Sequence, residues 1–393
     1  MDPDLSALDV FLEATGADGY LIDADSEDAD QYYLSGFDAP DPYLTLYDGE
    51  VHLLFTRSLE YGRAKREARA ATVERGTDYG YPSKVEEYGP KEARKRTIAD
   101  FLAAYDVETV AAPPRFPLAT ADGLREQGIE VTADEDDTLT TVRATKTDEE
   151  IEHIRAAQRA NEAALARAEE LISGASVDEE GQLLADGEVL TSEHVTEEIE
   201  VTLLRHGCAL DDTIVACGRD AADPHDRGSG PLEAGEPIII DIFPRSKSSR
   251  YHADMTRTFC HGEPSDRLGE WFDLTDEAKE AALAAVEPGA TGDEVHAAAS
   301  KVYEDAGLPT LRKDPTAETG FIHSTGHGIG LDVHEQPSVS PDAGELEPGH
   351  VITIEPGLYD PTVGGVRIED LVVVTESGYE NLTDYPTHLR VDS

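Results

Sequence analysis

Three of the 13 histidines in the chain lie close together in the segment HSTGHGIGLDVHE, residues 323–335. They are His323, His327 and His334, and the glycines between them make this backbone a poor helix former. His327 stands between Gly326 and Gly328, and glycine allows a ligand or another backbone to approach closely. One histidine beside glycine is weak evidence, but three in one short segment predict a functional site.

Two aspartates stand in segments that are otherwise strongly apolar, where burial of an unpaired charge is costly. Asp241 follows three isoleucines, and Asp254 lies in HADMTRTF. A hairpin loop centred on Lys247 and Ser248 would place them directly opposite each other, with their Cβ atoms about 4.5–5.5 Å apart. Two carboxylates in that position repel each other unless a cation lies between them. The alternative is that both are exposed strand acids, which a chain this acidic could carry.

Two glutamates follow β-branched residues in a similar way, Glu355 in VITIEPG and Glu369 in VRIED. The residues Val363-Gly364-Gly365 lie between them and predict a turn, which would make the two segments a second hairpin. The even separation of the glutamates requires an odd loop or a bulge, so their direct pairing stays open.

Together with His327, these four acids form a candidate set of five metal ligands. Four carboxylates carry a charge of −4, which two divalent cations would balance. Mostly oxygen donors with one imidazole suit Mn²⁺, Fe²⁺ or Co²⁺ better than a structural zinc. The chain contains no HExxH motif, so the common zinc-protease helix is not predicted.

Two predicted domains must position these residues, and the first covers residues 1–142. GYLIDAD predicts a strand, YLTLYDGEVHLLFT a hairpin that turns at Asp48-Gly49, and KEARKRTIADFLAAY a helix, while TVAA and IEVTA predict short strands. This alternation is typical of a small α/β domain, and the segment contains no catalytic cluster.

The second predicted domain covers residues 143–393. Its long first helix follows Thr147, which has capping-box spacing with Glu150, and Thr291 with Glu294 is a second capping box. Further helices are expected near 193–206, 268–286 and 292–306, with a surface excursion over 176–193. The segments TIVACG, PIIIDIF, ADMTRTF, VITIEPGLY and VRIEDLVVV predict strands.

The composition excludes some classes of function. The chain has 83 acidic and 32 basic residues and a net charge of −51, which would repel nucleic acid. The acids are spread along the whole chain, and this predicts the salt-adapted surface of a protein from a halophile. Three cysteines without paired spacing predict a reducing compartment. No signal segment or long apolar run is found, so a soluble, cytoplasmic protein without membrane contact is expected.

Several motifs resemble, in order, those of the pita-bread metallopeptidases (family M24): DIFPRSKSSRYHADMTRTF, HSTGHGIGLDVHE, ITIEPGLY and GVRIEDLVVV. IVACGRDAADPH resembles the family motif that supplies a further histidine. The family includes methionine aminopeptidases, Xaa-Pro aminopeptidases, Xaa-Pro dipeptidases (prolidases) and creatinase. The resemblance implies an α/β (α+β) architecture. A small creatinase-type N-terminal α/β domain would precede a pita-bread catalytic domain, whose curved, mainly antiparallel sheet is covered by helices.

The resemblance also implies roles for individual residues. The metal ligands would be Asp241, Asp254, His327, Glu355 and Glu369, and the two ions Mn²⁺ or Co²⁺, with Fe²⁺ or Zn²⁺ as alternatives. His334 matches a histidine that contacts the substrate and the tetrahedral intermediate. His323 and His225 match histidines of the substrate pocket, and Arg367 matches an arginine beside the last ligand. In two departures from the family pattern, the loop between the aspartates is about two residues longer, and DIF replaces DIG.

The implied activity is hydrolysis of Xaa-Pro peptide bonds by a dinuclear enzyme, as an Xaa-Pro dipeptidase or an Xaa-Pro aminopeptidase. A hydroxide that bridges the metals would attack the carbonyl, Glu355 would carry its proton to the leaving nitrogen, and His334 would stabilise the oxyanion. Substrates would be short proline-containing peptides, and the family implies a homodimer. The alternatives are a metal-dependent lyase or other non-peptidase hydrolase on the same fold, or a non-catalytic binding module. Creatinase-type chemistry is disfavoured because all five ligands are present.

Overall fold

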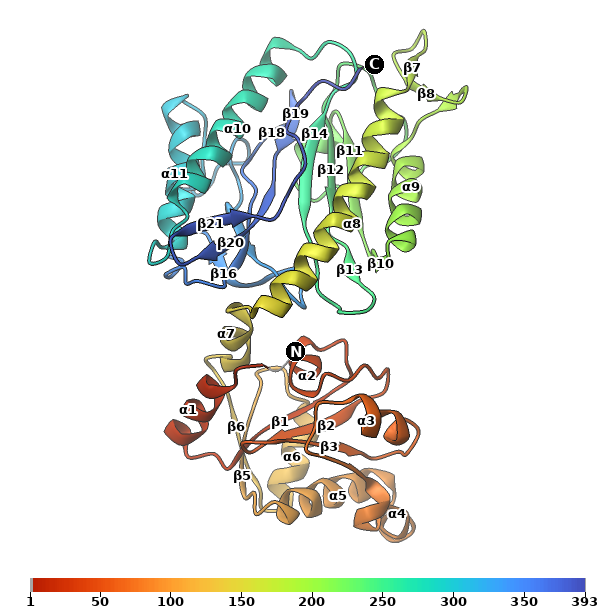
Figure 1. Ribbon diagram of the computed structural model, residues 1–393, viewed down its shortest axis with the longest axis vertical. Coiled ribbons are helices and arrows are strands. Elements are labelled where there is room, and N and C mark those ends of the chain that lie inside the picture. Colours follow the sequence, from red (N-terminus) through yellow and green to blue (C-terminus); the bar gives the residue numbers. More distant parts are fainter. Residues whose placement is uncertain (1–2, 393) are drawn as a thin grey trace. The chain divides into compact units, whose positions relative to one another are not determined.

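The computed structural model describes residues 3–392 of the chain. The chain divides into two compact units, the first ending at Arg143 and the second beginning at Ala144. Each unit is described by itself (Figure 1).

The first unit is a mixed six-stranded sheet in the order β4-β3-β2-β1-β5-β6. The predicted hairpin is present: β2 (Tyr43–Tyr47) and β3 (Val51–Phe55) are antiparallel and are joined by a turn at Asp48-Gly49-Glu50. The other strands are β1 (Gly19–Ala24), β4 (Thr72–Arg75), β5 (Thr109–Ala112) and β6 (Glu130–Ala133). The helices are α1 (Ser6–Thr15), α2 (Ala29–Ser35), α3 (Tyr61–Glu67), α4 (Tyr81–Tyr88), α5 (Pro90–Ala104), α6 (Leu118–Glu126) and α7 (Thr138–Ala144), with a 3₁₀ turn η1 (Gly76–Tyr79).

The second unit begins with a half built on a three-stranded sheet in the order β11-β12-β14. Its strands are β11 (Thr213–Cys217), β12 (Ile238–Ile242) and β14 (Met255–Phe259), and its helices are α8 (Asp148–Ser173) and α9 (Ser192–Arg205). Short strands β10 (Cys208–Ala209) and β13 (Arg245–Ser246) pair beside it, and a 3₁₀ turn η2 spans Asp220–Ala222. The predicted excursion after α8 contains a small sheet of β7 (Ser176–Val177), β8 (Leu183–Ala185) and β9 (Glu188–Val189).

The other half of the second unit is built on a five-stranded sheet in the order β16-β15-β17-β20-β21. Its strands are β15 (Gly326–Gly328), β16 (Glu335–Val339), β17 (Val351–Ile354), β20 (Asp370–Thr375) and β21 (Gly378–Asn381). A hairpin of β18 (Gly357–Asp360) and β19 (Gly364–Arg367) continues from β17 and returns to β20. The helices are α10 (Asp266–Ala285) and α11 (Gly292–Asp305). Neighbouring strands in both of these sheets pair antiparallel.

Each half of the second unit has its own apolar core. Leu165 and Ile172 of α8 pack with Ile240 of β12 in the first core. Trp271 of α10 packs with Ile352 of β17 in the second. Both predicted capping boxes close, on α8 and on α11, and they fix where these two helices begin. In Figure 1 the strands lie between α8 and α9 on one side and α10 and α11 on the other.

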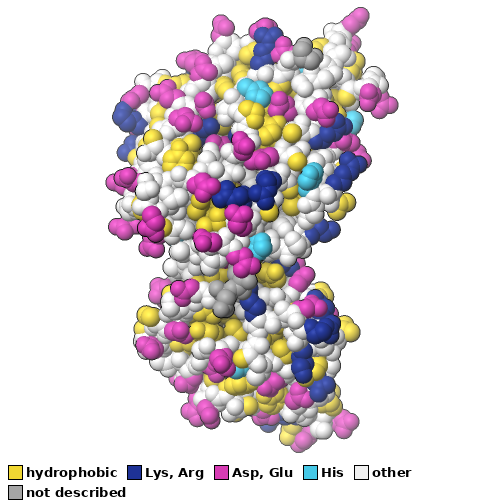
Figure 2. Space-filling view, in the orientation of Figure 1, with side chains coloured by type: hydrophobic (Ala, Val, Ile, Leu, Met, Phe, Trp, Pro, Cys, Tyr) yellow, Lys and Arg dark blue, Asp and Glu magenta, His cyan; other side chains and the backbone are white. Residues whose placement is uncertain are grey.

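Acidic side chains are scattered over the visible face of both units (Figure 2). They do not gather in one patch there, which agrees with their even spread along the sequence. Among the described residues, no helix is long and apolar enough to cross a bilayer.

Candidate metal centre

Asp241 and Asp254 lie on one face of the first sheet, but they are not directly opposite each other. Asp241 pairs with Thr256, so Asp254 is its diagonal neighbour on the same face. The prediction of direct pairing is wrong because the loop is centred one residue later than expected. It closes with the Ser246 N–H donating to the Tyr251 carbonyl at 2.9 Å. A shift of one residue in the loop centre moves the register by two, which preserves the shared face.

Glu355 and Glu369 lie opposite each other in the second predicted hairpin. Ile354 pairs with Asp370 on one side of the glutamates, and β18 pairs with β19 on the other side. Both sets of pairs have the same register, which places Glu355 opposite Glu369. The loop that closes the hairpin is residues 361–363, an odd number, as direct pairing requires. The predicted turn at Val363-Gly364-Gly365 therefore lies two residues too late. The strands are interrupted at both glutamates, whose backbone N–H groups donate instead to Thr325 and Thr256.

His327 lies in the middle of β15, where its two glycine neighbours allow close packing of backbones. A Cβ at Gly326 would lie 1.9 Å from the Thr353 carbonyl oxygen, and one at Gly328 would lie 2.2 Å from the Gln336 carbonyl oxygen. The His327 N–H donates to Thr353 Oγ1 at 3.1 Å, and Nδ1 lies 3.0 Å from the Gly328 carbonyl oxygen. Nδ1 therefore carries a proton, and Nε2 is the nitrogen that faces the acids.

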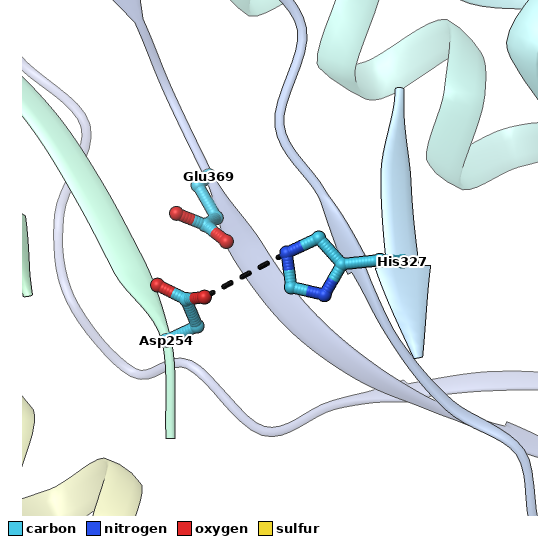
Figure 3. Close-up of side chains that lie close together, drawn as sticks. All are labelled: Asp254, His327 and Glu369. Atoms are coloured by element: carbon cyan, nitrogen blue, oxygen red, sulfur yellow. Dashed lines mark ion pairs between the residues drawn. The ribbon is translucent and has the colours of Figure 1, made fainter. Parts of the chain in front are cut away.

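Side chains from both halves of the second unit meet at this point. Asp254, His327 and Glu369 each offer a ligand atom, and these atoms all lie within 4.8 Å of one another (Figure 3). His327 Nε2 lies 3.8 Å from Asp254 Oδ2 and 3.3 Å from Glu355 Oε1. The group therefore joins residues that are more than 100 positions apart in the chain.

Three buried carboxylate oxygens of this group accept no hydrogen bond within the described residues. They are Asp241 Oδ1, Asp254 Oδ1 and Glu369 Oε1. Buried polar atoms in proteins are nearly always paired, and a set of unpaired acceptors needs an explanation. Oxygen donors beside one imidazole are the ligand set of Mn²⁺, Fe²⁺ or Co²⁺. The residues present therefore fit divalent cations.

Burial and the proximity of the acids shift the pKa values of the group. Burial first, and then the neighbouring carboxylates, raise the pKa of Asp254 and of Glu369 well above their usual values. Burial alone would also raise the pKa of Glu355, but the hydrogen bond and the charge of His327 outweigh it and lower this pKa to about 2. The same contact raises the pKa of His327, although burial opposes this shift.

A chain of hydrogen bonds runs from Asp241 away from the cluster. Arg367 Nη2 donates to Asp241 Oδ2 at 2.6 Å, and Arg367 Nη1 donates to the Tyr359 hydroxyl at 2.8 Å. That hydroxyl lies 3.1 Å from His323 Nε2, while His323 Nδ1 lies 2.7 Å from the Ser324 carbonyl oxygen. The Tyr359 hydroxyl therefore accepts from Arg367 and donates to His323. Burial lowers the pKa of His323 to about 4, so it is neutral at pH 7.

The two remaining histidines, His334 and His225, are exposed residues near the cluster. The His334 ring packs edge-on against the His327 ring, with centroids 4.4 Å apart. Burial and the charge of His327 lower the pKa of His334, which keeps it neutral near pH 7. His225 is exposed in the loop after η2 and is close enough to His323 and His334 to lower their pKa values. The structure thus brings all the candidate site residues into one region.

Two further residues of this region were not identified from the sequence. Thr256 is fully buried and its hydroxyl donates to Glu369 Oε2 at 2.7 Å. The strand period of two would have found it, because it lies two residues after Asp254. Tyr359 is 1% exposed, and nothing in its local sequence marks it, because its partners come from distant segments.

Comparison with known proteins gives two family matches. Residues 152–376 match the model of metallopeptidase family M24, and residues 5–157 match the creatinase/prolidase N-terminal domain. The Xaa-Pro dipeptidase of Pyrococcus furiosus is 31% identical over 385 residues, which cover 96% of this chain and 97% of that protein. The probable dipeptidase PepE of Mycobacterium tuberculosis is 36% identical over 261 residues, 65% of this chain and 62% of that protein.

Solved structures agree over nearly the whole chain. The prolidase from Pyrococcus horikoshii superposes with a TM-score of 0.78 at 26% identity, covering 98% of this chain and 99% of the other. The X-Pro aminopeptidase from Thermotoga maritima gives a TM-score of 0.78 at 27% identity, covering 96% and 98%. These matches confirm the predicted fold class, a creatinase-like N-terminal domain followed by a pita-bread domain.

Proposed function

The chain belongs to metallopeptidase family M24, and we propose that it hydrolyses the peptide bond that precedes proline in short peptides. The observation that carries this proposal is the buried cluster of acids and His327, with three carboxylate oxygens that accept no hydrogen bond within the described residues. The near full-length likeness to an Xaa-Pro dipeptidase supports the substrate class.

We assign five residues as ligands of two divalent cations. They are Asp241, Asp254, His327, Glu355 and Glu369. Four carboxylates balance the charge of two such ions, and Mn²⁺ or Co²⁺ suit this donor set. When bound, the ions would activate a water as nucleophile and polarise the peptide carbonyl.

The side chains of the protein supply the proton transfers and the orientation. Glu355, whose Oε1 lies 3.3 Å from His327 Nε2, would accept a proton from the nucleophile and pass it to the leaving nitrogen. His334 is neutral near pH 7 and can donate its N–H to the oxygen that becomes negative in the transition state. Arg367 holds Asp241 and, through Tyr359, fixes the orientation of His323.

The direct test measures hydrolysis of an Xaa-Pro dipeptide after addition of Mn²⁺ or Co²⁺. The assay is run in strong salt, because a net charge of −51 repels itself at low ionic strength. No hydrolysis by a folded, metal-loaded sample would refute the proposed function. Comparing Xaa-Pro with Xaa-Pro-Xaa peptides distinguishes a dipeptidase from an aminopeptidase, and sedimentation tests the proposed homodimer.

The role of His334 has its own test. His334→Ala should lower kcat by roughly 100-fold, the loss typical of one oxyanion donor, while the bound metal content stays unchanged. The matched control is His206→Ala, since His206 is an exposed histidine at the end of α9 and its loss should leave kcat unaffected. Equal loss of activity and metal in His334→Ala would mean that His334 serves the metal centre instead.

A further inference from the structure

Lys146 and Glu335 form an ion pair in the interior of the second unit. Lys146 Nζ lies 2.9 Å from Glu335 Oε2, and the two side chains are only 1% and 2% exposed. The residues are 189 positions apart in the chain. Glu335 directly follows His334 in the sequence, so the buried pair lies next to the candidate substrate-binding histidine.

Stability alone is a weak reason for such a pair. Removing two charges from water can cost more than their attraction returns, and apolar residues in their place are often equally stable. The chain has only 32 basic residues against 83 acidic ones. Most basic residues can offset negative charge at the surface, so the burial of one calls for a reason. The hydrogen bonds of Glu335 indicate a role other than stability.

Glu335 holds the turn that carries His334. Its second oxygen, Oε1, accepts a hydrogen bond from the Asp332 backbone N–H at 3.0 Å. Gly330 leaves the space for this carboxylate, because a Cβ at that position would lie 2.5 Å from Glu335 Oε2. The Gly330 N–H also donates to the Asp332 carbonyl oxygen at 3.0 Å. The turn of residues 330–335 therefore surrounds the carboxylate of Glu335, its last residue.

Lys146 connects this carboxylate to the strand that leads to Glu355. The Lys146 N–H donates to the Gly349 carbonyl oxygen at 2.9 Å, and Thr145 forms a β-bridge with His350. Residue 351, the next along the chain, begins β17. The lysine is thus fixed at its backbone to one segment of the site and at its ammonium group to another.

We propose that the Lys146–Glu335 pair is a positioning device that sets the His334 ring against the metal ligand His327. Glu335 is buried at the start of β16, while His334, in the bend just before it, packs against His327. The His327 and His334 rings are 4.4 Å apart at their centroids, a contact that a loose turn would not maintain. This inference rests on the proposed peptidase function and deepens it.

Three variants separate positioning from stability. Lys146→Met with Glu335→Met removes both charges of this pair together, so the fold should persist, but the Asp332 N–H loses the Glu335 carboxylate as acceptor. Lys146→Met with Glu335→Gln is also uncharged, yet the glutamine carbonyl can still accept from Asp332. The control removes another buried pair, Asp30 with Arg143 in the first unit, whose side chains are 5% and 4% exposed at 2.7 Å, as Asp30→Leu with Arg143→Met.

The double methionine variant should lose roughly 100-fold in kcat on an Xaa-Pro dipeptide, because a small misplacement of a catalytic group has a cost of that order. Its Co²⁺ affinity, read from the visible absorption of the bound ion, should stay at the level of the unmodified chain. The glutamine variant should recover at least about tenfold of kcat, and the control should keep full activity. If the double methionine variant does not fold, Lys146→Met with Glu335→Leu makes the same comparison, because leucine also gives the Asp332 N–H no acceptor.

Amide hydrogen exchange tests the anchor without any substrate. The Asp332 amide should exchange faster in the double methionine variant and regain protection in the glutamine variant. Unchanged exchange, a kcat at the level of the unmodified chain, or a loss of Co²⁺ affinity equal to the loss of kcat would each overturn the proposal. A folded, metal-loaded protein that does not hydrolyse Xaa-Pro peptides would refute the proposed function, while the exchange result would still decide whether the pair holds the turn.

Discussion

The hydroxyl of Thr256 connects a proposed metal ligand to the arginine that organises the site. It donates to Glu369 Oε2 at 2.7 Å and accepts from Arg367 Nε at 3.2 Å. Thr256 is fully buried, so no water replaces the hydroxyl when it is removed. Thr256→Val keeps the side-chain shape and the strand preference, and it removes only these two hydrogen bonds.

The expected loss follows from the charge of the partners. A hydrogen bond to a charged group contributes about 1.5–3 kcal/mol, and each 1.4 kcal/mol corresponds to about a factor of ten in affinity. Without its hydrogen bond, Glu369 would be less well oriented, so Thr256→Val should bind Co²⁺ roughly 10- to 100-fold more weakly, the range found when a partner of a metal ligand is removed.

A matched control lies two residues further along the same strand. Thr258 is also fully buried, but its hydroxyl contacts the Arg367 backbone, accepting from its N–H at 3.0 Å and donating to its carbonyl oxygen at 2.9 Å. Thr258→Val should therefore lower thermal stability without a comparable loss of Co²⁺ affinity, measured by calorimetric titration in strong salt. Equal Co²⁺ affinities in Thr256→Val and Thr258→Val would refute the reasoning.

Three further predictions follow from the same geometry. Tyr359→Phe removes the hydroxyl between Arg367 and His323 and should lower kcat by about tenfold without loss of metal, and a loss of metal would show that the hydroxyl supports the ligands. The raised pKa values of Asp254 and Glu369 mean that the metal-free folded state binds extra protons, so its stability should fall as pH rises from about 4. Melting curves of the metal-free protein across pH test this, and the fall should be absent in Asp254→Asn with Glu369→Gln. Metal binding should release these protons, and calorimetry in buffers of different ionisation enthalpy would show no buffer dependence if the reasoning is wrong.

Strand alternation allowed the sequence to predict that Asp241 and Asp254 share a face, because side chains two apart point to the same side. The exact register could not be predicted. The polar turn SKSS offers several loop centres, and only the closing hydrogen bond from Ser246 to Tyr251 selects one. Helix starts were predicted more closely, since a capping box at Thr147 satisfies backbone donors locally.

The contacts that organise the site depend on residues far apart in the chain, and local patterns do not reveal them. Tyr359 lies between Arg367 and His323 only because β18 pairs with β19 on one side and bridges to Gly320 on the other. Lys146 reads as a charged residue before a helix, yet the fold buries it against Glu335. Such partners require the tertiary structure, whereas the ligand candidates were visible as charges in apolar strands.

Arg367 neutralises only part of the charge of the cluster. It pairs with Asp241, and the other hydrogen bonds of its side chain run to neutral groups. Asp254 and Glu369 each keep a buried oxygen that accepts no hydrogen bond within the described residues. Burial and mutual repulsion favour the protonated forms of both carboxyls, and they raise both pKa values although the charge of Arg367 opposes the shift. Protons and metal ions thus compete for the same oxygen atoms, and metal affinity must weaken as pH falls.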